Sequence, residues 1–228
     1  MKTIEILEIL RKKPVFKLSD IERITLSKRN YAKLILNRLK KKGLIKKITE
    51  NVYTTKKDIF VLSSNLTYPS YISFWTAVYY LGYTEQIVND IYIAVTKKRK
   101  NIIFEGYKIN FIPMKYFFGY KKINTTDGEL FIADNEKLIL DSLLKWKFSG
   151  NFDEIKKIFQ NAEISKEKLI FYLKKINNQT LIKRTGYLLF EIKKIDISKS
   201  FKLDRNYVVL NPFLKKWKKT NSKWRVKL

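Results

Sequence analysis

Apolar residues near the start of the chain recur at helical spacing in three stretches. A serine or threonine precedes each of them, at Thr3, Ser19 and Ser27. Their side-chain oxygens can accept hydrogen bonds from the backbone N–H groups of a first helical turn, so we predict that they cap three helices. The apolar stripe that we expect the third helix to bury consists of Ala32, Ile35, Leu36 and Leu39.

A glycine and a hairpin pattern follow the third helix. Gly43 stands where a helix often ends on a residue with positive φ. Residues 44–48 and 52–55 are short segments with apolar and β-branched side chains, which predict two strands joined by a tight turn at 49–51, where Asn51 can adopt the left-handed conformation. Three helices followed by a two-stranded hairpin is the order of a winged helix-turn-helix. We therefore predict this fold for the head of the chain, residues 1–58.

The rest of the chain, residues 59–228, mixes both patterns and predicts a larger mixed domain. Residues 59–68 are interpreted as a linker, after which Ser70 or Ser73 can start a helix that ends at Gly82. Further strands are expected at 91–95, 101–104, 107–112, 121–126, 129–133, 207–210 and 224–226, and further helices after Asp134 and near 153–160, 165–177 and 178–191. The predicted fold class is α+β, with the winged head followed by this larger domain.

The positive charge of the chain is large and unevenly spread. With 48 Lys and Arg residues against 21 Asp and Glu residues, the formal net charge is +27. Residues 1–58 hold 17 Lys and Arg residues against six acids, a net charge of +11. A genomic A+T bias would also enrich lysine, but it does not explain this concentration in the head. The charge favours a polyanionic partner, with DNA or RNA first and an anionic membrane surface as the alternative.

Residue types that support several other functions are missing. The chain has no Cys and no His, which excludes disulfides, thiolate or imidazole zinc sites and Ser-His or Cys-His nucleophile pairs. It shows neither a phosphate-binding glycine loop nor the metal-binding acidic pair of a nucleotidyltransferase. We therefore expect no enzyme activity, cofactor or metal, although carboxylates alone can hold Mg²⁺. With no apolar run near ~20 residues and no signal-peptide pattern, we expect a cytoplasmic chain without a membrane partner.

Two acidic pairs have the residue type that could bind a metal ion. Asp134 with Glu136, and Asp153 with Glu154, each stand at the start of a predicted helix. Carboxylates at this position accept N–H groups and stabilise the positive end of the helix dipole. We interpret both pairs as helix-starting residues.

The third predicted helix and the hairpin carry the candidate DNA-binding residues. In a winged helix the third helix enters the major groove, where Arg can pair with guanine and Asn with adenine. Lysines beside the wing are placed to contact phosphates. The candidates are Ser27, Lys28, Arg29, Asn30, Lys33, Asn37, Lys40, Lys46, Lys47, Lys56 and Lys57. The face expected directly opposite the buried stripe consists of Arg29, Lys33, Asn37 and Lys40. The alternative interpretation is an ordinary solvated basic surface.

A second basic run follows one of the predicted strands. It consists of Lys97, Lys98, Arg99 and Lys100. Such a run can add phosphate contacts, bind an acidic partner surface or simply be solvated, and the sequence leaves all three open.

Several segments resemble the AbiEi family of antitoxins. The segments that carry the resemblance are Pro69–Ser73, Ala77–Gln86, Ile91–Arg99, Phe117–Tyr120, Ile132–Asp141 and Lys223–Val226. The similarity spans nearly the whole chain, and it is specific in residues 69–141 and generic in the head. Two positions differ from the family pattern. Asn51 stands where members usually have Gly before the wing, and Asp134-Asn135 replaces a usual Thr-Pro.

The resemblance implies the antitoxin of a type IV toxin–antitoxin system that acts in phage defence by abortive infection. The winged head would repress the system's own promoter by binding operator repeats in double-stranded DNA, and the larger antitoxin-type domain would oppose a cognate nucleotidyltransferase toxin. Carried over by position, the groove-reading helix is residues 28–42 and the wing is residues 46–55. The sequence implies no particular oligomeric state.

Three other functions remain open from the sequence. The chain could be a stand-alone winged-helix transcription regulator without a toxin partner. It could be an enzyme acting on nucleic acid, which would need a metal-binding carboxylate cluster. It could also bind RNA instead of duplex DNA.

Overall fold

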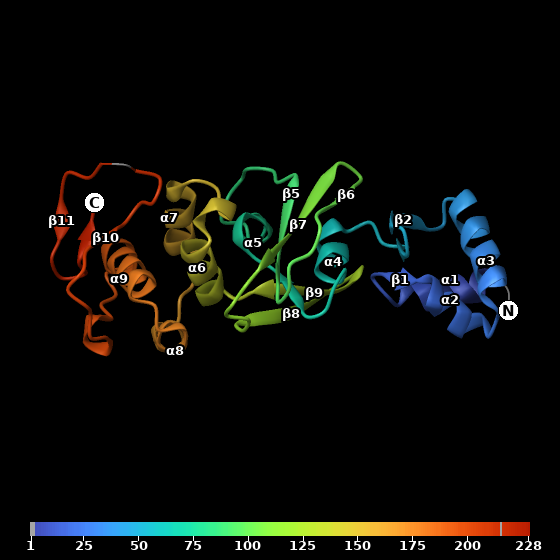
Figure 1. Ribbon diagram of the computed structural model, residues 1–228, viewed down its shortest axis with the longest axis horizontal. Helices are drawn as coiled ribbons and strands as arrows, with labels where there is room; N and C mark the ends of the chain where they lie inside the picture. The colour runs from blue at the N-terminus through green and yellow to red at the C-terminus, as the bar shows by residue number, and fades with distance from the viewer. Residues whose placement is uncertain (1–2, 215) are drawn as a thin grey trace. The chain divides into compact units, whose positions relative to one another are not determined.

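The computed structural model describes residues 3–214 and 216–228, and its fold is α+β (Figure 1). Contacts between Cα atoms divide the chain into two compact units. The first comprises the described residues up to Ile72 together with Asn89–Pro113 and Lys122–Ile132. The second comprises Ser73–Val88, Met114–Lys121 and the described residues from Ala133 onwards. The head is thus grouped with strands of the large sheet, and the domain boundary at residue 58 stays a prediction.

The head contains the three expected helices and a small sheet. The helices are α1 (Thr3–Arg11), α2 (Leu18–Thr25) and α3 (Arg29–Lys41), and the strands are β1 (Phe16–Lys17), β2 (Lys46–Thr49) and β3 (Val52–Thr54). The strands pair in the order β1-β3-β2. Figure 1 shows α3 followed along the chain by β2. Strand β1 was not expected, because two residues carry no pattern, and it forms by antiparallel pairing of Phe16 with Tyr53.

The three serine and threonine caps predicted for the head were wrong. Thr3 already lies within helix α1. Helix α2 begins before Ser19, because the carboxylate of Asp20 accepts the backbone N–H of Lys17 at 2.8 Å. Helix α3 begins after Lys28, while the hydroxyl groups of Ser27 and Thr25 are hydrogen-bonded to each other at 2.7 Å.

The core of the head forms as the periodicity predicts. Gly43 ends the α3 region with a φ of 68°. The buried side chains of α3 are Ala32, Ile35, Leu36 and Leu39, as expected. They pack with Ile6, Leu7, Leu10, Phe16, Leu18, Ile21 and Ile45. Removing this apolar surface from water stabilises the head and fixes which face of α3 is turned outward.

Residues 59–68, predicted as a linker, contain a buried helix instead. Helix α4 (Ile59–Ser64) begins at Asp58, whose side chain accepts the backbone N–H groups of Phe60 and Val61. Ile59, Val61 and Leu62 are all buried. The segment is helical because it has both an acidic cap and apolar side chains to bury.

A six-stranded mixed sheet follows α4. Its strands are β4 (Ser70–Ile72), β5 (Asp90–Val95), β6 (Ile102–Phe104), β7 (Tyr107–Pro113), β8 (Tyr120–Thr125) and β9 (Gly128–Ala133). They are ordered β6-β7-β5-β4-β9-β8. Of the two predicted starts for the next helix, Ser73 is confirmed, because the helix begins at Phe74. Ser70 is wrong, because it lies in β4, which pairs with β5 in the antiparallel sense and with β9 in the parallel sense.

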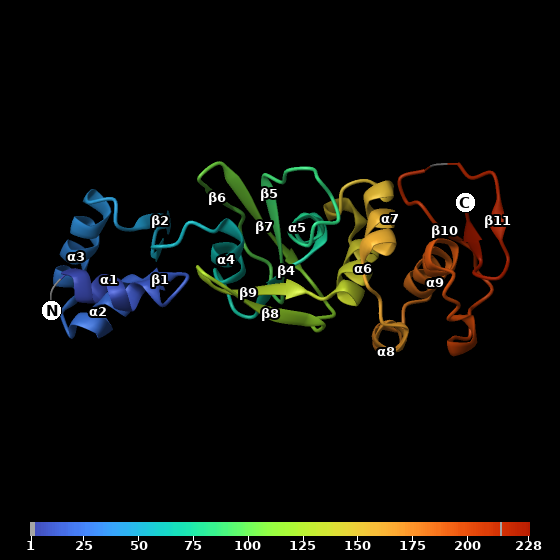
Figure 2. The same cartoon turned by 180° about the vertical axis from the view of Figure 1, so that it is seen from behind.

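The second unit is mainly helical. Its helices are α5 (Phe74–Tyr80), α6 (Asn135–Leu144), α7 (Phe152–Asn161), α8 (Lys166–Ile176) and α9 (Gln179–Lys193), with short 3₁₀ turns at Trp146–Phe148 and Ser198–Ser200. A small sheet of β10 (Val208–Val209), β12 (Val226–Lys227) and β11 (Thr220–Asn221) lies beside α9 (Figure 2). The indole of Trp224 is fully buried and packs against Gly186, where a Cβ atom would approach it to 2.1 Å.

Candidate nucleic-acid interface

Helix α3 presents a defined outer face to solvent. Successive residues of a helix are turned by about 100°, so side chains three, four and seven positions apart lie on one line. The line opposite the buried stripe carries Asn30, Leu34, Asn37 and Lys41, all of them exposed.

Cationic side chains flank this outer line on both sides. Arg29, Lys33 and Lys40 lie along one flank, and Arg38 with the helix-ending Lys42 lies along the other. The structure therefore corrects the sequence prediction: of its four opposite-face residues, only Asn37 is near the centre of the outer face. Leu34, Arg38 and Lys41 are also exposed on this side of α3 and were not among the predicted residues, although their helical spacing from the buried residues could have identified them.

The residues at the start of α3 are accessible to different degrees. Lys28, Arg29 and Asn30 are exposed, but Ser27 is only half-exposed and its hydroxyl is engaged with Thr25. Arg29 lies 3.9 Å from Glu22 and keeps 64% of its side chain exposed. An ion pair this long and this exposed contributes little free energy, so the guanidinium is available to a ligand.

The wing lysines differ in their partners. Lys46 and Lys47 of β2 are both exposed, and the ammonium group of Lys46 is paired with the carboxylate of Glu105 in the turn between β6 and β7. After β3, Lys57 is exposed and Lys56 is half-buried.

The junction after the wing is held by backbone contacts. The N–H of Lys56 donates to the Thr54 hydroxyl at 2.9 Å. The carboxylate of Asp127 accepts the N–H groups of Lys57 and Asp58 at 3.2 Å and 2.9 Å. These contacts fix the main chain through backbone N–H groups and do not involve the lysine ammonium groups.

The basic run at residues 97–100 forms a loop between β5 and β6. Its four side chains, Lys97, Lys98, Arg99 and Lys100, are exposed, and none makes an ion pair within the described part of the chain. The loop therefore offers free cations in the same compact unit as the head.

Electrostatics inside the head stabilise α2. Burial alone would raise the pKa of Asp20, but the Lys13 ammonium, 2.7 Å away, and the Lys17 N–H outweigh it and lower that pKa below its ordinary value. The ionised carboxylate lies in the first turn of α2, where it also interacts favourably with the positive end of the helix dipole.

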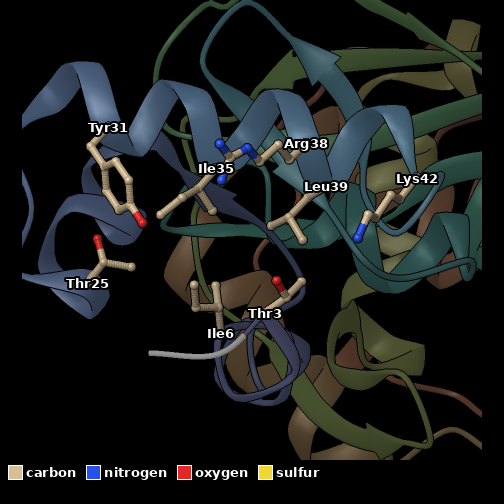
Figure 3. A pocket seen from close by; sticks show the side chains of 8 residues that line it. All are labelled: Thr3, Ile6, Thr25, Tyr31, Ile35, Arg38, Leu39 and Lys42. Atoms are coloured by element: carbon tan, nitrogen blue, oxygen red, sulfur yellow. The ribbon is translucent and has the colours of Figure 1, made fainter.

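Two hollows border α3. Leu34, Asn37, Arg38, Lys40 and Lys41 line a surface depression on its outer side. A cavity of about 230 Å³ separates α3 from α1, and its lining consists of Thr3, Ile6, Thr25, Tyr31, Ile35, Arg38, Leu39 and Lys42. Figure 3 shows Arg38 and Tyr31 on the α3 side of this cavity, with Ile6 and Thr3 on the other.

The acidic residues at the start of α6 have structural partners. Asp134 accepts the N–H of Lys137 at 2.8 Å and caps α6, as predicted. Glu136 accepts the Ser165 N–H at 2.7 Å and pairs with Lys168. Among residues 3–214 and 216–228, no group of three Asp or Glu side chains is arranged to hold a metal ion.

The second acidic pair also lies at a helix start. Asn151 caps α7 in place of the acids, with its side chain accepting the N–H of Glu154. Asp153 and Glu154 occupy the first turn and pair with Lys156 and Lys157.

Comparison with known proteins shows the fold. No protein-family model matches the chain, and no curated protein matches it in sequence. Among solved structures, it is similar to the RV2827C protein from Mycobacterium tuberculosis, with a TM-score of 0.66 at 11% sequence identity. The alignment covers 98% of this chain and 90% of that one. The α+β architecture is thus shared over nearly the whole length. In the described residues, no helix has the length and apolar character needed to cross a bilayer.

Proposed function

We propose that this chain is a DNA-binding transcription regulator with a winged helix-turn-helix head. One observation carries the proposal. Helix α3 buries one apolar stripe, and its solvent-exposed face carries asparagine side chains with Lys and Arg residues on both flanks. Packing of the apolar stripe fixes which face of α3 is turned outward. A helix with its side chains is about 10–12 Å across and so fits a major groove, which is about 12 Å wide.

Charge supports duplex DNA as the partner. The net charge of +11 in residues 1–58 favours a polyphosphate, and the cations near α3 and β2 are mostly exposed. Neutralising each phosphate would make the logarithm of the affinity fall by about 0.9 per tenfold increase in salt. The loop Lys97–Lys100 could extend this contact within the same unit.

The same proposal extends to an antitoxin role. The resemblance of residues 69–141 to the AbiEi antitoxins supports a non-enzymatic regulator that represses its own promoter and opposes a nucleotidyltransferase toxin. The alternative is a stand-alone regulator without a toxin partner. Co-expression with the product of the adjacent gene separates the two, because an antitoxin relieves the growth arrest caused by a nucleotidyltransferase encoded there, and a stand-alone regulator has no such neighbour.

The DNA-binding proposal is tested with the full chain and the duplex upstream of its own gene. Binding is measured by fluorescence anisotropy against an unrelated duplex and an RNA duplex of the same length at equal salt. Preferential binding to the upstream duplex supports the proposal. Equal binding to all three, or preference for the RNA, contradicts it.

A further inference from the structure

The outer line of α3 is uncharged over its first two turns. Asn30, Leu34 and Asn37 follow one another at spacings of four and three residues, so their side chains are neighbours on the helix surface. Leu34 is 52% exposed at the centre of the line. A single exposed leucine needs no explanation, but one set between two amides and enclosed by cations on both flanks is a specific arrangement.

Each of the three side chains matches one partner in an A·T pair. The amide of Asn can bond both the N7 and the N6 positions of adenine in the major groove. An exposed aliphatic side chain packs against the 5-methyl group of thymine, which guanine and cytosine lack. A guanine-reading stripe would instead place Arg or Lys at the centre of the face.

The flanks supply the phosphate contacts. Arg29, Lys33 and Lys40 lie on one side of the line, and Arg38 and Lys42 lie on the other. When a helix lies in the major groove, its outer line faces the edges of the bases. Each of its two flanks then faces the phosphates of one DNA strand. The charged residues are therefore placed for affinity, and the uncharged residues are placed for sequence selection.

Resting on the DNA-binding function proposed above, we propose that Asn30, Leu34 and Asn37 read adjacent A·T base pairs in the major groove. Leu34 recognises thymine methyl groups, and the two amides recognise adenine. The bound site accordingly contains a short A·T run beneath α3.

The test begins with selection of a bound site from a pool of random duplexes by the full chain. Replacing thymine by deoxyuridine in the selected A·T run then removes only the methyl groups. We expect a loss of about fourfold in affinity for each methyl group that Leu34 contacts. Leu34→Ala loses affinity for the thymine site by a similar factor and no longer distinguishes thymine from uracil. Asn37→Ala loses about tenfold and relaxes selection at adenine.

Ile4→Ala is the matched control. Ile4 is an aliphatic side chain of the head with 68% exposure, but it lies on α1 and not on the outer line of α3. Its variant retains both affinity and the response to uracil. Circular dichroism of each variant verifies that the head is folded.

The possible failures are distinguishable. Selection of a G·C site, or an A·T site whose uracil form binds the wild type equally well, overturns the base-reading assignment and leaves DNA binding intact. If no duplex is enriched at all, the proposed function fails and the assignment fails with it.

Discussion

Lys46 in β2 is paired with Glu105 in the turn between β6 and β7, so the wing is tied to the edge of the large sheet within one compact unit. The two residues are 59 positions apart in sequence. Both side chains keep nearly half of their surface exposed. The contact therefore neutralises one of the cations proposed to meet phosphate.

Replacing Glu105 by Gln should strengthen DNA binding. An exposed ion pair is worth up to about 1 kcal/mol, so releasing Lys46 should raise the affinity up to about fivefold. Anisotropy titrations at several salt concentrations measure the change. Glu129→Gln, which removes the same charge from an exposed pair with Lys122, is the control. An equal gain from both variants would mean that overall charge and not the wing contact is responsible.

Asp20→Asn should destabilise the head in a pH-dependent way. The folded pKa of Asp20 is lowered, so its ionised form contributes stability above its unfolded pKa of about 3.9, and this contribution is lost as the pH falls through the folded pKa. At about pH 7 the variant should lose on the order of 1 kcal/mol, as for a lost helix cap. Urea unfolding measures the difference, which should shrink below about pH 4. A difference that stays constant with pH would show that Asp20 acts by packing alone.

The buried pair of Lys137 and Asp141 should control the stability of the second unit. Both side chains are fully buried, and Asp141 also accepts a hydrogen bond from Ser73 at 2.9 Å. Lys137→Met should lower the free energy of unfolding by about 3–5 kcal/mol, because it leaves a carboxylate buried without its cation. Denaturant titration measures the loss.

A second substitution and a surface control sharpen this result. Adding Asp141→Leu to Lys137→Met should recover part of the loss, since the uncompensated charge is then gone. Lys174→Met, at an exposed position of α8, should change the free energy of unfolding little. If the double variant is less stable than Lys137→Met alone, the cost arises from packing and not from the buried charge.

The local features of the fold could be predicted from sequence. The α3 stripe from Ala32 to Leu39, the positive φ of Gly43 and the Asp134 cap each depend on a few neighbouring residues. The prediction of a linker at residues 59–68 was wrong, because Asp58 followed by apolar residues is itself a signal for a capped, buried helix.

The missed features depend on partners distant in sequence. Strand β1 exists because Phe16 pairs with Tyr53, and the Lys46–Glu105 contact needs the fold to bring its residues together. The placement of the candidate site on α3 stays a prediction, but the outer face of that helix is centred on other residues than expected, because charge was given more weight than angular position. Leu34 was passed over for this reason.

The most direct measurement compares the affinity for duplex DNA of two double variants that change the net charge by the same amount. Arg29→Glu with Lys33→Glu changes the α3 flank, and Lys166→Glu with Lys174→Glu changes exposed lysines of α8 by the same total charge. With a helix-in-groove contact, the α3 variant loses binding to the upstream duplex while the α8 variant keeps affinity close to wild type. Retained binding by a folded α3 variant, or equal loss in both, would contradict the assignment of α3 as the DNA-reading helix.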